Sequence, residues 1–357
     1  MANSEREAKL KRLKEIAEKG ALESRHDTVR EFFERMETQQ VPIFEDFHAG
    51  IDNFYQAPRS QALTDMDIAC VGVPFEVSAP IRAGTRFGPK SAREWSKLRG
   101  PVHESWNVIP FDLCRIADFG DVVFSSPHDV NECVAELETL YSSFRENNIF
   151  PLSFGGVHTM SHPILKGLAG DEPLALVHID AHADTYRDAY QGDQYSDAAV
   201  FLNAALEGGI DPDHTIQIGI RGRSVIFWDF SHEAGMRVVA MDEFFDIGVA
   251  GVLAEIKKII GDRKFYLSVD SDGIDATYLP GTQLPEPFGL TSREVLQIIR
   301  GLRGMNIVGA DFVELCPPYD PHGISANLAA ALGFEMLCLL AEAKHRAHGD
   351  KQPTVWG

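Results

Sequence analysis

Short apolar runs and longer amphipathic stretches alternate along most of this 357-residue chain. From residue 67 onward, continuous apolar runs such as 67–75 and 149–156 are too short for helices and are typical of strands buried on both faces. Between them, apolar residues recur at helical spacing and polar residues fill the other positions. Strands that alternate with helices in this way predict an α/β fold, with a parallel, doubly wound sheet between two layers of helices.

The pattern places the elements of this core one after another along the chain. Strands are predicted at 67–75, 115–123, 149–156, 176–182, 215–221, 237–245, 264–270 and 305–315. Helices are predicted from residue 89 and at 128–147, 164–168, 197–207, 248–261, 292–302 and 323–346. In a sheet of this kind, functional side chains collect beyond the carboxyl ends of the strands.

The first 62 residues have a different pattern. Residues 3–19 and 26–36 predict two charged helices, and residues 37–62 predict an extended arm. We therefore expect an N-terminal helical and extended arm over residues 1–62 and a core domain over residues 63–357. An arm placed ahead of the first core strand is expected to pack on a neighbouring subunit.

Charge and cysteine content restrict the partners and the compartment. A formal net charge of −20 argues against nucleic acid and anionic membrane surfaces, and it is compatible with a cationic substrate. No apolar run approaches the roughly 18 residues of a membrane span, and the charged N-terminus lacks the apolar centre of a secretory signal. The five cysteines are scattered without a CxxC pair, which indicates reduced thiols and a cytoplasmic protein.

Candidate chemistry begins with LVHIDAHADTY, residues 176–186, which places Asp180, His182 and Asp184 at every second position. On an extended strand these three side chains would project from one face and form an edge for a divalent cation. For a lone DxH, a buried strand followed by an acidic turn would be the favoured explanation. A second block of the same period makes the metal interpretation stronger.

That second block is SVDSDGID, residues 268–275, in which Asp270 and Asp272 follow another apolar strand. His158 and Glu314 also stand beyond predicted strands. Six carboxylate and imidazole ligands from three strand ends match the needs of two adjacent divalent ions, because one carboxylate can bridge both. Paired ions activate water near neutral pH, and a free Glu314 leaves the pocket anionic. The hypothesis is metal-activated hydrolysis of a positively charged, planar group.

With these blocks in place, the chain resembles the ureohydrolases, the arginase and agmatinase family. GGVHTMS, HIDAHADTY, SVDSDGIDATYLPGT and GADFVELCPPYD are similar to the signature blocks of that family, and the resemblance covers about residues 65–345. It implies an arginase-like three-layer αβα fold and a binuclear manganese or nickel centre. It also implies hydrolysis of a guanidino C–N bond of a small cationic substrate, which gives urea and an amine.

The resemblance implies a role for each matching residue. One metal would be held by His158 and Asp184, the other by His182 and Asp272, and both by the bridging Asp180 and Asp270. Asp184 would also take part in proton transfer. Glu314 would pair with the guanidinium, because a carboxylate can accept two parallel N–H bonds.

Three positions depart from the blocks of the family. Val157 stands where the family has an aspartate, so metal affinity or geometry is expected to differ. Asp197 stands where the family has a histidine that is its candidate proton shuttle and substrate contact. Ala276 replaces a proline, which is a smaller change. A carboxylate at position 197 could accept hydrogen bonds from a second cationic or N–H-rich group, which makes Asp197 a candidate site residue.

This interpretation of Asp197 favours guanidine, an alkylguanidine or a biguanide such as metformin as substrate, with agmatine and guanidinobutyrate as further candidates. The long arm and the altered loop resemble the guanidine and metformin hydrolase branch. That branch implies Ni²⁺, whereas a set of four carboxylates and two imidazoles suits Mn²⁺. We expect a trimer or a hexamer, formed by this chain alone or with a paralogous subunit.

Two other functions fit part of the pattern. The altered Val157 and Asp197 are also expected in a low-activity or regulatory subunit of a mixed ureohydrolase oligomer. Asp180 and His182 superficially suit a deacetylase-like enzyme with a single metal. The intact DxHxD and SxDxD blocks favour two metals and count against that second alternative.

Overall fold

The computed structural model of the chain describes residues 2–19, 27–39, 52–77, 81–187, 194–222, 227–347 and 349. They belong to two compact units. One unit comprises Met1–Ile51 with Pro101–Ile109, and the other comprises Asp52–Gly100 with Pro110–Gly357. In the first unit, α1 (Ala2–Lys19) and α2 (Asp27–Gln39) are helices where the sequence predicts them. Residues 40–51 of the predicted arm lie outside the described residues.

The last part of the predicted arm, residues 52–62, packs on the core of the second unit, and apart from one short helix its backbone is largely extended. It contains the short helix η2 (Phe54–Gln56), in which Phe54 is fully buried. The Phe54 ring stacks on Phe154 with centroids 4.7 Å apart. The backbone N–H of Phe54 donates to the Asp118 carboxylate at 2.8 Å. Burial of this aromatic ring stabilises the packed conformation, which the proline and glycine content of the arm does not reveal.

The second unit is built on one eight-stranded sheet in which all described strand pairs are parallel. Its order is β2-β1-β3-β8-β7-β4-β5-β6. The strands are β1 (Ile68–Val73), β2 (Ile116–Asp121), β3 (Phe150–Gly155), β4 (Leu174–Ile179), β5 (Ile210–Ile220), β6 (Arg237–Ala240), β7 (Phe265–Asp270) and β8 (Ile307–Val313). The strands β1, β4 and β7 are buried along their whole length, and β3 is buried except at its first residue, as the continuous apolar runs predict.

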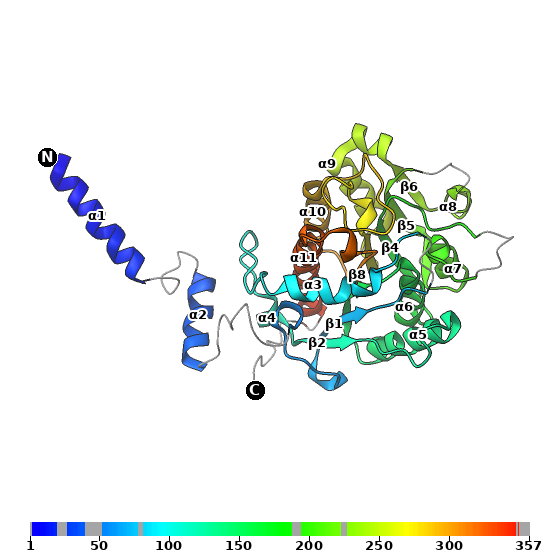
Figure 1. Ribbon diagram of the computed structural model, residues 1–357, viewed down its shortest axis with the longest axis horizontal. Helices are drawn as coiled ribbons and strands as arrows, with labels where there is room; N and C mark the ends of the chain where they lie inside the picture. The colour runs from blue at the N-terminus through cyan, green and yellow to red at the C-terminus, as the bar shows by residue number, and fades with distance from the viewer. Residues whose placement is uncertain are drawn as a thin grey trace. The chain divides into compact units, whose positions relative to one another are not determined.

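Helices cover both faces of this sheet (Figure 1), so the predicted α/β fold with a parallel sheet is confirmed. One layer contains α3, α9, α10 and α11, and the other contains α5, α6 and α7. The helices of the unit are α3 (Gly88–Ser96), α4 (Pro110–Leu113), α5 (Val130–Glu146), α6 (Ser161–Ala169), α7 (Val200–Leu206), α8 (Asp229–Glu233), α9 (Met241–Ile260), α10 (Ser292–Gly301) and α11 (Ile324–Ala347).

The predicted strand at 237–245 is wrong in its second half. The strand β6 ends at Ala240, and residues 241–245 form the first turn of α9. Ala240 has an extended backbone and offers no side-chain cap, so the N-cap signal is missing, and the acidic Asp242 and Glu243 of the first turn are the signal that was overlooked. The short helices α4 and α8 were also missed, because they hold too few residues for a helical period to be recognised.

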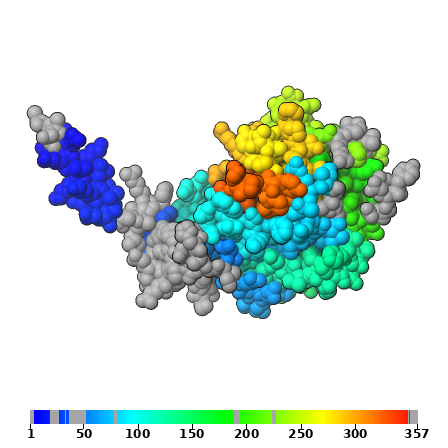
Figure 2. Space-filling view, in the orientation of Figure 1, coloured from blue at the N-terminus to red at the C-terminus, as the bar shows by residue number. Residues whose placement is uncertain are grey.

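The helix α11 is the one helix in the described part of the chain that is long and apolar enough to cross a membrane. However, 78% of its most apolar window is buried inside the fold, against β8, β3, α3 and α10. Its N-terminal side continues from η9 (Pro317–Tyr319), which lies beside the connection between β1 and α3 (Figure 2). The Cys316 thiol lies 3.6 Å from the carbonyl oxygen of Ala83 in that connection. The ends of β8 and β1 are therefore held together near the carboxyl edge of the sheet.

Candidate metal centre

The predicted ligands gather at the carboxyl ends of β3, β7 and β4, and Glu314 follows β8; these four strands are neighbours in the sheet. Asp270 is the last residue of β7, and Asp272 lies in η8 (Ser271–Gly273). His158 opens η5 (His158–Met160), which follows the end of β3 after a short turn formed by Gly156 and Val157. A Cβ atom at Gly156 would overlap the carbonyl oxygen of Phe75, so glycine is what allows this turn to pass so close to the β1–α3 connection.

One premise of the sequence argument is wrong. Asp180, His182 and Asp184 do not lie on an extended strand, because β4 ends at Ile179 and Asp184 has a φ of 52°. On a straight strand the Cα atoms of residues 180 and 184 would stand about 13 Å apart, too far for their side chains to share one small ion. The loop after β4 bends the chain, and the three side chains converge.

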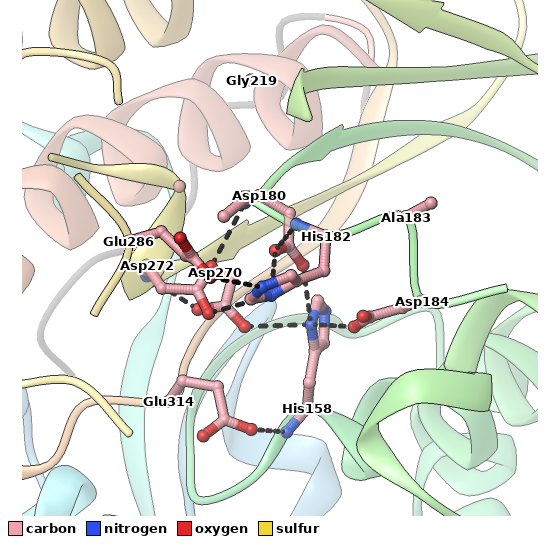
Figure 3. Close-up of polar contacts among 12 residues, drawn as sticks. His158, Asp180, His182, Ala183, Asp184, Gly219, Asp270, Asp272, Glu286 and Glu314 are labelled. Carbon is pink, nitrogen blue, oxygen red and sulfur yellow. Dashed lines mark hydrogen bonds and ion pairs between the residues drawn. The ribbon is translucent and has the colours of Figure 1, made fainter. Parts of the chain in front are cut away.

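His158 is the centre of the first group of ligands (Figure 3). Its Nδ1 atom lies 3.2 Å from Asp180 Oδ2, 2.9 Å from Asp184 Oδ2 and 3.1 Å from Asp270 Oδ2. A single ring nitrogen cannot hydrogen-bond properly to three carboxylates, and Nδ1 has no partner of good geometry. Three oxygens and one imidazole nitrogen around a common point are a donor set for a divalent cation.

The other ring nitrogen of His158 identifies which atom is free to bind a cation. Nε2 lies 2.9 Å from the Ser268 hydroxyl, and that hydroxyl donates to the Asp311 carboxylate at 2.6 Å. Since Ser268 has given its only proton to Asp311, its oxygen accepts from the Nε2–H of His158. With a cation bound between Nδ1 and the three carboxylates, His158 would be neutral, would keep its proton on Nε2 and would direct the lone pair of Nδ1 at the ion.

His182 is the centre of a second group that shares Asp180 with the first. Its Nδ1 atom lies 3.2 Å from Asp272 Oδ2 and 3.7 Å from Asp180 Oδ1. On the other side of the ring, Nε2 lies 3.5 Å from Glu286 Oε1 (Figure 3). Ligand atoms of Asp180, His182 and Asp272 all lie within 4.8 Å of one another. The two groups therefore offer two adjacent positions for cations, joined by one carboxylate.

The charges of these buried groups perturb one another strongly. Burial raises the pKa of Asp270, and the charges of Asp272 and Asp180 raise it further. Burial alone lowers the pKa of His158, but its carboxylate neighbours outweigh this and raise the pKa well above its usual value. Four aspartates crowded in a low-dielectric site repel one another, and divalent cations are what such a site requires to be stable. The residues fit a binuclear divalent-metal centre.

Sequence reasoning missed the polar residues that support these ligands. His178 is a buried residue of β4, and its Nε2 lies 2.7 Å from Asp180 Oδ2. The Gln217 amide donates to His178 Nδ1 at 3.2 Å and to the Ala183 carbonyl at 2.6 Å, which leaves His178 to donate to Asp180. A signal was present, since His178 extends the period of two backwards from Asp180. Gln217 could not be found without the pairing of β4 with β5.

Two further carboxylates, those of Glu314 and Asp197, interact with residues of the centre. The N–H of His158 donates to Glu314 Oε1 at 2.6 Å. Burial raises the pKa of Glu314, and the charge of Asp197 raises it further. Burial likewise raises the pKa of Asp197 to about 7, with a contribution from the charge of Asp184. The charges of Asp197 and Glu314 therefore act on each other and on the ligand groups, and the role of Asp197 at the site stays a prediction.

The remaining motif residues have structural surroundings. Val157 is fully buried in the apolar core, and its N–H donates to the Phe75 carbonyl at 2.9 Å. Asp275, the last aspartate of the SVDSDGID block, accepts from the Thr277 and Gly289 amides at 2.9 and 3.0 Å. It stabilises the loop that carries Glu286 and is not among the residues around the two cation positions. The predicted effect of Val157 on metal affinity stays a prediction.

Comparison with known proteins agrees with this geometry. The model of the Arginase family matches residues 66–338. A guanidinopropionase of Pseudomonas aeruginosa is 40% identical over 87% of this chain and 97% of its own, and an agmatinase of Gallus gallus is 37% identical over 85% and 91%. The solved structure of proclavaminate amidino hydrolase from Streptomyces clavuligerus has a TM-score of 0.78 and 36% identity, covering 84% of this chain and all of its own.

Proposed function

Because the chain belongs to the arginase family of metal-dependent ureohydrolases, we propose that it cleaves a guanidino C–N bond of a small cationic guanidino compound. The products would be urea and an amine. The observation that carries this proposal is the convergence of three carboxylates on His158 Nδ1, with Glu314 bound to the backbone of the same histidine. The ligands and a carboxylate for the substrate are thereby held in one place.

Six residues would hold two divalent metal ions. His158 and Asp184 would bind one, His182 and Asp272 the other, and Asp180 and Asp270 would bridge them. When bound, the two ions supply a water of lowered pKa as nucleophile and neutralise the charge of the four aspartates. Carboxylate and imidazole ligands suit Mn²⁺ and also accommodate Ni²⁺, so we propose one of these two metals.

Glu314 would bind and orient the substrate. Its Oε1 accepts the His158 N–H, while Oε2 is buried without a hydrogen-bond partner. A buried carboxylate oxygen without a partner is costly, and a guanidinium N–H would satisfy it. The positive charge would also favour the ionised form of Glu314. Asp184, at the edge of the ligand group, would take up the proton released by the nucleophile and pass it to the leaving amine.

Asp197 would select among guanidino compounds. Together with Glu314 it places two carboxylates beside the ligand groups, and a substrate with its own carboxylate near the guanidinium would be repelled by both. Guanidine, an alkylguanidine or a biguanide such as metformin carries only N–H donors and positive charge there. We therefore place these compounds ahead of guanidino acids as substrates, with agmatine between the two classes.

The test is release of urea by the purified chain loaded with Mn²⁺ or Ni²⁺. The panel holds guanidine, dimethylguanidine, metformin, agmatine, guanidinobutyrate and arginine. Turnover is expected with at least one compound, and Asp270→Asn should abolish it together with stoichiometric metal binding. Asp171→Asn, at an exposed position before β4, is the matched control and should change neither.

Silence across the panel, with two metals bound per chain, would contradict the proposal. It would favour the alternative of a low-activity or regulatory subunit in a mixed oligomer. Light scattering of the purified chain would test the proposed trimer or hexamer at the same time. Addition of a paralogous chain would then show whether activity depends on a partner.

A further inference from the structure

Asp197 stands in a short segment, residues 194–199, that is tied to the fold by its own backbone. The carbonyl of Ala198 accepts from the Tyr186 N–H at 2.8 Å, and the Ala199 N–H donates to the Ser196 carbonyl at 3.2 Å. Directly beyond it, the Phe201 N–H donates to the carbonyl of Asp184 at 2.9 Å. The segment is therefore joined to the chain that carries the metal ligand Asp184.

Asn203 of α7 adds a side-chain connection. Its amide Nδ2 donates to the carbonyl of Gln194 at 2.8 Å, and its Oδ1 accepts from the guanidinium of Arg187. Asn203 itself is 2% exposed, whereas its partners Arg187 and Gln194 are exposed residues, so the amide anchors two surface positions from inside the fold. The amide of Asn203 thus links Gln194, the first residue of the 194–199 segment, to Arg187, which follows the block 176–186. An aspartate could not do this, because it cannot donate to Gln194.

His162 of α6 supports the same segment from another direction. Its ring stacks on Tyr195 with centroids 5.6 Å apart and an interplanar angle of 22°. The imidazole is 1% exposed, and its Nε2 lies 3.3 Å from Glu207 Oε2, which is also ion-paired with Lys166 at 3.0 Å. Tyr195 precedes Asp197 by two residues, so a fixed Tyr195 ring limits where the Asp197 backbone can lie.

Such support is needed because of the charge around Asp197. The negative charges of Asp184 and Glu314 act on its carboxylate, and repulsion would turn a loosely held side chain away from the site. An aspartate prefers full exposure to water over a half-buried position beside two other acids. The contacts of Asn203 and His162 oppose that movement.

We propose that Asn203 and His162 are positioning residues that hold the 194–199 segment so that Asp197 faces the metal centre and discriminates between substrates. Neither residue is a member of the two ligand groups, and the contacts described above connect each to the chain that carries Asp197. The inference rests on the proposed function for its effect on substrate choice. Its structural part, the fixing of residues 194–199, stands independently of any activity.

The first measurement is amide hydrogen exchange of the metal-loaded protein. Asn203→Asp keeps the acceptor for Arg187 and removes the donor to Gln194, and it should speed exchange at the Tyr186 and Ala199 amides. Asn306→Asp is the matched control, because Asn306 Nδ2 also donates to a backbone carbonyl at 2.8 Å, far from the site. Unchanged protection at those amides in Asn203→Asp would overturn the proposal whether or not the chain is an enzyme.

The second measurement is the ratio of kcat/KM for an alkylguanidine to that for guanidinobutyrate. Asn203→Asp and His162→Ala should each lower this ratio roughly threefold to tenfold, the effect of one lost hydrogen bond or ring contact, with metal content unchanged. His162→Phe keeps a ring against Tyr195 and should restore most of the ratio. In an Asp197→Asn background, the Asn203→Asp change should no longer affect the ratio.

The proposed hydrolase function and the positioning role of Asn203 and His162 would fail through different outcomes. A wild-type chain that hydrolyses nothing, with exchange changes as expected, would sink the proposed function and leave the positioning role intact. Active variants with an unchanged ratio, or an equal effect of Asn203→Asp with and without the Asp197 carboxylate, would overturn the positioning role and leave the function intact.

Discussion

The Nε2 atom of His178 lies 2.7 Å from Oδ2 of Asp180, the carboxylate that belongs to both ligand groups. Gln217 fixes the tautomer by donating to the other ring nitrogen, so His178 donates its proton to Asp180. A hydrogen-bonded carboxylate keeps its orientation without the metal, and its basicity is tuned by the donor. His178 is therefore expected to control how tightly the shared aspartate binds cations.

Replacement of His178 should weaken metal binding. His178→Phe keeps a ring of similar size against Phe201, whose centroid is 4.2 Å away, and removes the hydrogen bond to Asp180. We expect a loss of roughly tenfold to a hundredfold in metal affinity, measured by competition with a chelator. His128→Phe, at an exposed position before α5, serves as control. Equal affinities in wild type and His178→Phe would show that Asp180 needs no such support.

Removal of the metals should destabilise the fold. Asp180, Asp184, Asp270 and Asp272 are buried together, and without cations they repel one another. Excess metal at a hundred times its dissociation constant would raise the free energy of unfolding by about 2.7 kcal/mol for each site. Thermal melts with chelator and with Mn²⁺ or Ni²⁺ test this. In Asp270→Asn the difference between the two melts should shrink, and an undiminished difference would place the metals elsewhere.

Asp197→His should change substrate preference. It removes one negative charge beside Glu314, so the carboxylate of a guanidino acid would be repelled by Glu314 alone and no longer by both residues. We expect KM for guanidinobutyrate to fall roughly tenfold, and KM for an alkylguanidine to rise. Asp171→His is the matched control at an exposed position. A uniform loss of kcat for all substrates, with KM unchanged, would instead assign Asp197 a role in proton transfer.

The residues around the two cation positions show most clearly what the sequence can and cannot predict. The period of two in residues 180–184 and 270–272 singled out side chains that the structure brings together beyond the apolar strands. The same reasoning assumed an extended strand, and the positive φ of Asp184 shows why this fails. The side chains of residues 180 and 184 could not reach one ion from a straight strand, because their Cα atoms would stand about 13 Å apart.

The supporting residues were harder to predict for a related reason. Asn203, His162 and Gln217 act through partners on other elements, and each pairing depends on which strands and helices are neighbours. The alternating pattern predicts a parallel sheet but not the order β7-β4-β5 that brings Gln217 to His178. Polar residues in apolar elements were a usable signal, since a buried amide or imidazole requires a partner.

Lys344 provides a test of stability that is separate from the metal centre. It is a buried residue of α11, its ammonium binds the carbonyl of Asn148, and its Nζ lies 4.3 Å from the centre of the Phe150 ring. Burial lowers the pKa of Lys344 from 10.5 to about 8, against an opposing effect of the nearby Asp67 charge. The charged form is therefore disfavoured in the folded state.

The sign of the pH effect follows from this shift. Between pH 8 and 10.5 the unfolded chain holds a proton that the folded chain has released, so the free energy of unfolding rises with pH in this window. Cys114, whose pKa burial raises to about 12, opposes this above pH 9, so the comparison must be made with a Lys344→Met variant. From pH 7.5 to 9.5, wild type should gain about 2 kcal/mol relative to Lys344→Met. Urea denaturation at both pH values measures this difference. Lys90→Met of α3, an exposed position, is the control. The same pH dependence of the free energy of unfolding in wild type and Lys344→Met would mean that Lys344 stays charged in the folded protein.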